Sequence, residues 1–170
     1  ADTTTGGIVG VNHGTLINCQ FTGVVTGDSE VGGIVGRNES EGTIDHGTAR
    51  AIVTGKSSTG GIAGYNLGAI TGCTNVGSIN TEYPEASLDT DGFTAKMVDY
   101  INNKMAAADN DATNSVTNVA TDTGGIAGRS SGMILTSVNT GTIGYEHVGY
   151  NVGGIVGRTD GLVSGCVNQG

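Results

Sequence analysis

The sequence predicts an all-β protein, a right-handed parallel β-helix of about five three-strand coils with one helical insertion. Three observations lead to this fold. The pentapeptide Gly-Gly-Ile-Val/Ala-Gly occurs five times, glycine supplies 32 of the 170 residues, and isoleucine and valine recur between the glycines. The glycines lack the three-residue period of collagen. Repeats of this length instead indicate coils that stack and bury a shared core.

The repeats define the candidate core. Copies of the pentapeptide begin at Gly6, Gly32, Gly60, Gly124 and Gly153, so the spacings are 26, 28, 64 and 29 residues. Each copy supplies aliphatic residues at matching positions, and the three sets are Ile8, Ile34, Ile62, Ile126 and Ile155; Leu16, Ile44, Ile70, Ile134 and Val163; and Val25, Val53, Ile79 and Ile143. Short apolar and polar alternation between glycines and asparagines is typical of strands. We therefore expect three inward-facing aliphatic columns, one per strand.

A coil that turns this often needs backbone positions with positive φ, which glycine accepts and asparagine tolerates. Asn12, Asn38 and Asn66 occupy the same turn position in three successive copies. Stacked amides bond to one another along such an axis. We interpret this column as a structural ladder, with ligand contact as the alternative.

The long third spacing contains an insertion over residues 81–118, within a single repeat domain that covers residues 1–170. Inside it, Met97, Ile101 and Met105 recur at helical spacing, which predicts a helix over roughly 94–109. We expect its apolar face to dock on the flank of the coils. Binding to a membrane or a partner is the alternative.

The insertion also carries closely spaced carboxylates, at Asp89, Asp91, Asp109 and Asp111. Hard cations such as Ca²⁺ take several oxygens from such clusters. The full calcium-loop pattern, with Glu at its twelfth position, is absent. Solvated acidic turns are therefore the favoured interpretation, Ca²⁺ is the lesser one, and no other cofactor is expected.

Three cysteines, Cys19, Cys73 and Cys166, fall at one repeat position in the first, third and fifth coils. Two coil steps of about 4.8 Å exceed the reach of a disulfide. We therefore expect buried free thiols, and their dispersion excludes a zinc site. The sequence lacks HExxH and GxSxG, and its coils carry no stacked pairs of carboxylates. These patterns predict a chain without a catalytic centre.

The repeats GGIVGVNHGTLINCQFTGVVTG, GGIAGYNLGAITGCTNVGSI and GGIVGRTDGLVSGCVNQG resemble the GLUG repeat of bacterial cell-surface and secreted proteins. Those proteins include relatives of immunoglobulin A1 metallopeptidases. The resemblance covers nearly the whole chain outside residues 81–118. It implies a non-catalytic, extracellular or cell-surface module of a larger protein.

One outward column stands out directly after the pentapeptides, and it comprises Arg37, Tyr65, Arg129 and Arg158 after an initial Val11. Stacking of arginine on Tyr65 would let this row bind a carboxylate or sulfate on a glycan. In the favoured interpretation, the arginine stems instead cover neighbouring apolar surface and pair with Glu39 or Asp160.

The net charge of −9 disfavours nucleic acid as a partner, because only seven lysines and arginines are present. No apolar run is long enough to span a bilayer. The expected function is that of a rigid spacer or adhesive surface, with a host protein or a glycan as partner. An accessory substrate-recognition domain of a secreted metallopeptidase-like hydrolase is the alternative. A subunit that associates end to end is a third, because neither end of the sequence shows a capping segment.

Overall fold

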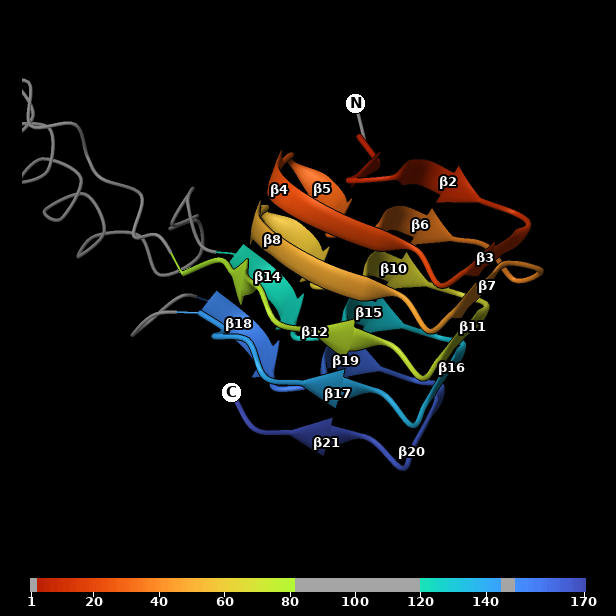
Figure 1. The fold of residues 1–170 in the computed structure, drawn as a ribbon. Coiled ribbons are helices and arrows are strands. Elements are labelled where there is room, and N and C mark those ends of the chain that lie inside the picture. The colour runs from red at the N-terminus through yellow and green to blue at the C-terminus, as the bar shows by residue number, and fades with distance from the viewer. Residues whose placement is uncertain (1–2, 82–119, 145–148) are drawn as a thin grey trace, which may run out of the picture. The chain divides into compact units, whose positions relative to one another are not determined.

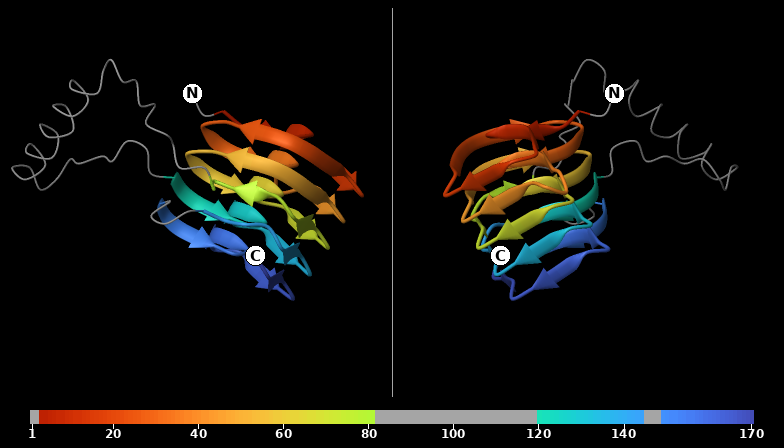
Figure 2. Two further views of the ribbon diagram at one scale, coloured as in Figure 1. Left: turned by 60° about the vertical axis from the view of Figure 1, so that its left-hand side comes forward. Right: turned by 90° about the vertical axis from the view of Figure 1, so that its right-hand side faces the viewer.

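The structure is a computed structural model that describes residues 3–81, 120–144 and 149–170, and these residues form one compact all-β unit. The predicted parallel β-solenoid is confirmed, since every strand pair within it is parallel (Figure 1). The coils stack as successive layers from the N-terminal to the C-terminal end of the unit (Figure 2). The predicted helix over 94–109 lies outside the described residues.

The number of strands per coil is four rather than the predicted three. We number the four sheets in the order in which the chain passes through them. The first contains β1 (Thr5–Gly6), β5 (Ser29–Gly32), β9 (Ser57–Gly60), β14 (Ala120–Gly124) and β18 (Gly149–Gly153). The second contains β2 (Val9–Asn12), β6 (Val35–Asn38), β10 (Ala63–Asn66), β15 (Ala127–Ser130) and β19 (Val156–Thr159).

The remaining two sheets complete each coil. The third contains β3 (Thr15–Ile17), β7 (Thr43–Asp45), β11 (Ala69–Thr71), β16 (Met133–Leu135) and β20 (Leu162–Ser164). The fourth contains β4 (Gln20–Thr26), β8 (Thr48–Thr54), β12 (Thr74–Asn75), β13 (Ser78–Ile79), β17 (Val138–Asn139) and β21 (Val167–Asn168). Strand β14 pairs with β9, so the stack continues in register after the insertion.

The additional strand arises because the pentapeptide forms a corner instead of one continuous strand. In the second coil, β5 ends at Gly32 and β6 begins at Val35, so Gly33 and Ile34 make the bend between the first and second sheets. Residues before the pentapeptide therefore form a sheet of their own. Its inward column includes Val31 and Thr59, which are fully buried.

The glycine at each such corner makes room for an interior side chain. A Cβ on Gly125 would overlap the side chain of Asn139, and a Cβ on Gly61 would overlap that of Asn75. Both would also collide with the glycine carbonyl of the neighbouring coil. The second glycine of the pentapeptide is thus required by close packing across the interior.

The aliphatic columns form the core, as the sequence predicts. In the inner coils their members are fully buried, namely Ile34, Ile62 and Ile126; Ile44, Ile70 and Ile134; and Val53 and Ile79. The first and third of these sets belong to different clusters, because Val53 and Ile79 pack with Val25 and Val31 at the corner between the fourth and first sheets. Ile8 in the first coil is 41% exposed, since no coil covers it in the described unit.

The predicted asparagine ladder is present. Asn12 donates through Nδ2 to Oδ1 of Asn38 at 2.8 Å, and Asn38 donates in the same way to Asn66 at 2.8 Å. Asn66 then donates to the hydroxyl of Ser130 at 3.2 Å, so the ladder continues where asparagine is replaced. Each amide also bonds the backbone carbonyl of a nearby glycine, as Asn38 does to Gly42. The column therefore ties each turn to the coil above and below.

A second ladder escaped sequence analysis. Asn75 donates to Asn139 at 2.8 Å, and Asn139 donates to Asn168 at 2.7 Å. Earlier coils have Ala49 and Phe21 at this inward position, so the column is not uniform along the sequence. Two amide columns thus run through the interior, one at the ends of strands of the second sheet and one, in the last three coils, at the ends of strands of the fourth sheet.

Removal of a central ladder amide should be more costly than removal of a terminal one. Asn38→Ala removes one acceptor of the Asn12 amide, the donor to Oδ1 of Asn66 and one of the donors to the carbonyl of Gly42, and we expect a loss of about 2–4 kcal/mol in unfolding free energy. Asn12→Ala breaks the ladder at its first member and should cost about half as much. Urea denaturation measures both, and equal losses would contradict the cooperative role of the ladder.

At Thr59, a substitution is expected to stabilise the protein. Its hydroxyl is buried and has no hydrogen-bond partner among the described residues, whereas Val31 occupies the same column one coil earlier. Thr59→Val keeps the shape and should raise the unfolding free energy by about 1 kcal/mol. The matched control is Thr123→Val, which should destabilise the protein because the Thr123 hydroxyl accepts from Asn80 at 3.0 Å. A loss of stability in Thr59→Val would refute this assignment.

Candidate functional site

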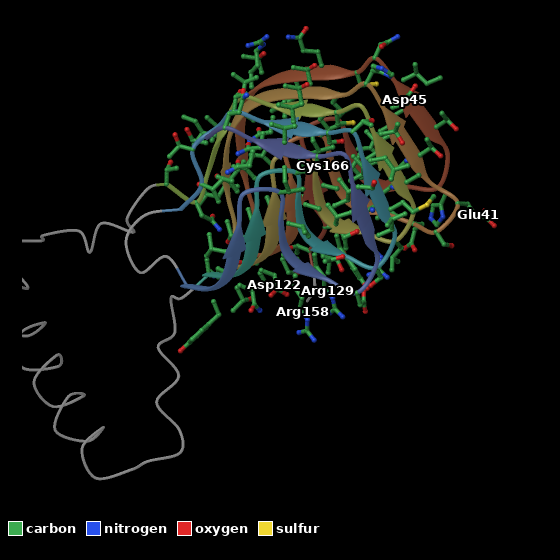
Figure 3. All side chains as sticks on the ribbon, turned by 90° about the horizontal axis from the view of Figure 1, so that it is seen from below. Glu41, Asp45, Asp122, Arg129, Arg158 and Cys166 are labelled. Carbon is green, nitrogen blue, oxygen red and sulfur yellow. The ribbon has the colours of Figure 1, made fainter. Side chains whose placement is uncertain are left out.

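The outward column predicted from the sequence lies on the second sheet. Strand register places Val11 beside Arg37, Arg37 beside Tyr65, Tyr65 beside Arg129, and Arg129 beside Arg158. We call Arg37, Tyr65, Arg129 and Arg158 the arginine row. Adjacent members are about 4.8 Å apart along the axis, as in any pair of neighbouring strands. Seen from the C-terminal coil, Arg129 and Arg158 project from the same side of the solenoid (Figure 3).

Tyr65 lies between two guanidinium groups. The Cζ atoms of Arg37 and Arg129 are each 5.2 Å from the centre of its ring, one from the preceding coil and one from the following coil. The stacking expected from the sequence is therefore present on both faces. Because both faces are covered, the ring holds the arginines in place and is not a free platform for a sugar. Its hydroxyl lies 3.2 Å from Oγ of Ser131.

Arg37 is neutralised by the protein itself. Its Nη1 donates to Glu30 at 2.9 Å and its Nε donates to Glu39 at 2.8 Å. Partial burial lowers the pKa of Arg37, but the two carboxylates outweigh this effect and the pKa lies above its usual value. Glu39 is the partner considered in the sequence analysis. Glu30 was missed because it belongs to the first sheet, seven residues earlier in the chain.

Arg129 and Arg158 differ from Arg37, because neither forms an ion pair with a carboxylate of residues 3–81, 120–144 or 149–170. Asp160, the second partner considered from the sequence, influences them from a longer distance. A hydrogen bond from Ser131 lowers the pKa of Asp160, and the charges of Arg129 and Arg158 lower it further. The Asp160 carboxylate is exposed to solvent.

Two further ionic contacts of the described residues do not involve the arginine row. Lys56 pairs with Asp28 at 2.7 Å, and His46 contacts Asp45 at 2.8 Å. Asp45 and Glu41 lie on a different side of the solenoid from Arg129 and Arg158 (Figure 3). The candidate calcium ligands Asp89, Asp91, Asp109 and Asp111 lie outside the described residues. Within the described part of the chain, no three His, Cys, Asp or Glu side chains are grouped to hold a metal ion.

All three cysteines are free thiols, as predicted. The predicted burial is confirmed for Cys73, which is fully buried, and is wrong for Cys19 and Cys166, which are partly exposed because they lie in the end coils of the described unit. Burial raises the pKa of Cys73 from 9.0 to about 11, against the opposing effect of the backbone N–H of Gly47, which donates to its sulfur at 3.3 Å. Cys73 is therefore an inert core residue at neutral pH.

Comparisons with protein-family models, with curated proteins and with solved structures found no match. The resemblance to GLUG repeats accordingly rests on the repeat residues themselves. No helix within the described ranges is long and apolar enough to cross a membrane.

The thiols make a prediction about reactivity. With a disulfide reagent at pH 8, Cys19 and Cys166 should be modified in the folded protein, and Cys73 should react only after unfolding, because its folded form retains the proton. Peptide mass analysis of the labelled protein locates the modified thiols.

The same pKa shift implies that the contribution of Cys73 to stability is present below pH 9 and is lost as the pH rises towards about 11. Modification of Cys73 as fast as Cys19 would overturn its assignment to the core.

Proposed function

We propose that this chain is a non-catalytic module of a cell-surface or secreted protein, a rigid solenoid whose arginine row binds an anionic ligand such as an acidic glycan. The observation that carries the proposal is the arginine row itself. It concentrates three of the four arginines of a chain with net charge −9 on one side of the second sheet.

Rigidity of the support favours a binding role. The row stands on strands whose next residues are Asn38, Asn66 and Ser130, which form the first amide ladder. The guanidinium groups of Arg37 and Arg129 are further held by Tyr65, at about 0.5–1 kcal/mol for each exposed cation–π contact. A ligand therefore meets side chains that are already in position, which reduces the entropy lost on binding.

The character of the titratable groups supports a non-catalytic role. In the described coils, Asp45 pairs with His46 and Asp28 pairs with Lys56, so these groups are occupied by a neighbour. The raised pKa of Cys73 and its burial remove the one fully enclosed thiol from consideration as a nucleophile. The described charges thus suit recognition by a surface better than proton transfer.

The proposal predicts retention on an immobilised polyanion. The protein should bind dextran sulfate at low salt, and binding should weaken as salt is added because the contacts are exposed. The double variant Arg129→Ala, Arg158→Ala should lose most of this retention while its circular dichroism and urea midpoint stay close to those of the parent protein. Surface plasmon resonance with uncharged dextran as the reference surface measures the effect.

Arg50 provides the matched control. It is the fourth arginine, it is exposed, and it lies on β8 in the fourth sheet, away from the arginine row. Arg50→Ala removes the same charge and should leave retention unchanged. Equal losses in the two experiments would show attraction by charge alone and would refute a site on the arginine row.

A further inference from the structure

The three arginines of the row differ in the residue that follows two positions later. Glu39 follows Arg37, Ser131 follows Arg129, and Asp160 follows Arg158. Strand register aligns Asn38, Ser130 and Thr159 in one column, so these three residues begin the same turn in different coils. The N–H of Asp160 bonds the carbonyl of Ser130 at 3.1 Å, which places Asp160 directly beside Ser131.

The residue at this turn position decides whether an arginine of the row pairs with a carboxylate of the protein itself. Glu39 reaches Arg37 and binds its Nε at 2.8 Å. Ser131 offers Arg129 no charge and instead contacts the hydroxyl of Tyr65 at 3.2 Å. Asp160 has a side chain one methylene shorter than that of Glu39, and it makes no ion pair with Arg158 in the described structure.

The first sheet repeats the contrast. Glu30, seven residues before Arg37, binds its Nη1 at 2.9 Å, and Asp122 stands seven residues before Arg129 in the same column. The Asp122 carboxylate is buried and accepts a hydrogen bond from Asn151 at 2.7 Å, with no ion pair to Arg129 among the described contacts. Arg37 is thus paired with a carboxylate on two sides, from Glu30 and from Glu39. Arg129 has no such ion pair with the residues at the corresponding positions, Asp122 and Ser131, and in this sense we call it open.

Resting on the proposed function, we propose that Arg129 and Arg158 form the anion site of the module and bind the carboxylate or sulfate groups of a linear acidic glycan. Ser131 and Asp160 determine its specificity, Ser131 by leaving Arg129 open and Asp160 by competing with the ligand for both guanidinium groups. Two like charges side by side on neighbouring strands repel each other, and a bound anion removes that repulsion. Guanidinium groups match oxyanions in bidentate geometry.

A glycan fits this surface better than an acidic peptide. The guanidinium of Arg129 stacks on the ring of Tyr65, whose hydroxyl contacts that of Ser131 at 3.2 Å, so the site has neutral hydroxyls near its charges. Acidic glycans present hydroxyls beside their anionic groups, whereas acidic side chains present carboxylates alone. A linear polymer that follows the solenoid axis also meets Arg158 and Arg129 in succession.

The decisive variant closes the site without removing an arginine. Ser131→Glu gives Arg129 the carboxylate that Glu39 gives Arg37, and it should weaken binding to dextran sulfate by about tenfold. Ser131→Gln introduces a neutral side chain of the same size as glutamate and likewise removes the contact with Tyr65. It should retain affinity for dextran sulfate within about twofold of the parent protein. Asp160→Asn removes the competing carboxylate and should strengthen binding by a few-fold.

Gln20→Glu controls for added negative charge, because Gln20 is exposed on β4 in the fourth sheet. It should leave affinity unchanged, and urea midpoints check that every variant folds. If the parent protein binds dextran sulfate but Ser131→Glu and Ser131→Gln bind alike, the assignment to Arg129 and Arg158 fails while the proposed function stands. If the parent protein binds no polyanion, both fail.

The class of ligand is tested with three polymers. Polygalacturonate supplies carboxylates on a glycan, dextran sulfate supplies sulfates on a glycan, and polyglutamate supplies carboxylates on a peptide. Binding that favours either glycan over polyglutamate, and that Ser131→Glu weakens, supports the proposal and tells which anionic group is preferred. Equal or tighter binding of polyglutamate overturns the choice of a glycan.

Discussion

Register between coils is the constraint on which the rest of the structure depends. Each strand bonds only to strands of the adjacent coils, so every residue has a fixed counterpart about 4.8 Å away. The amide ladders enforce this register from within, because a slip of one residue would separate Asn38 from both Asn12 and Asn66. With the register fixed, each aliphatic side chain of a column packs against the corresponding side chain of the next coil, as in the buried column Ile34, Ile62 and Ile126.

The same register builds the surface. A side chain that faces outward in one coil faces outward at that position in every coil, so an outward repeat position becomes a row. The arginine row is one result, and Tyr65 lies between Arg37 and Arg129 only because the three strands are neighbours. Variation next to a row then changes the ionic partners of its members without altering the fold, since Glu39 pairs with Arg37 and the corresponding residue after Arg129 is the neutral Ser131.

The solenoid also accepts departures from its repeat wherever register survives. Ser130 replaces asparagine at the end of the first ladder and still accepts the hydrogen bond from Asn66. His46, with a φ of 52°, occupies a left-handed corner that Gly72 fills in the next coil. After the insertion, β14 returns to its place beside β9. Change is therefore tolerated at corners, in loops and in the inward polar columns, as long as the strands stay paired in register.

The sequence by itself determined the parallel solenoid, the three aliphatic columns, the first amide ladder, the free thiols and the membership of the arginine row. All of these follow from residues that recur at one spacing, which is visible without coordinates. The first sheet was missed because the pentapeptide was interpreted as one continuous strand, whereas the two residues after its first glycine form a corner.

Only the tertiary structure decided which arginine is open. Glu30 and Asp122 come from a sheet other than that of the arginine row, and their distance from the guanidinium groups depends on side-chain length and on competing partners such as Asn151. The second amide ladder was hidden for a similar reason, since Ala49 and Phe21 interrupt its pattern in the first coils. Repetition fixes which residues are neighbours, and the packing of individual side chains fixes which neighbours bind.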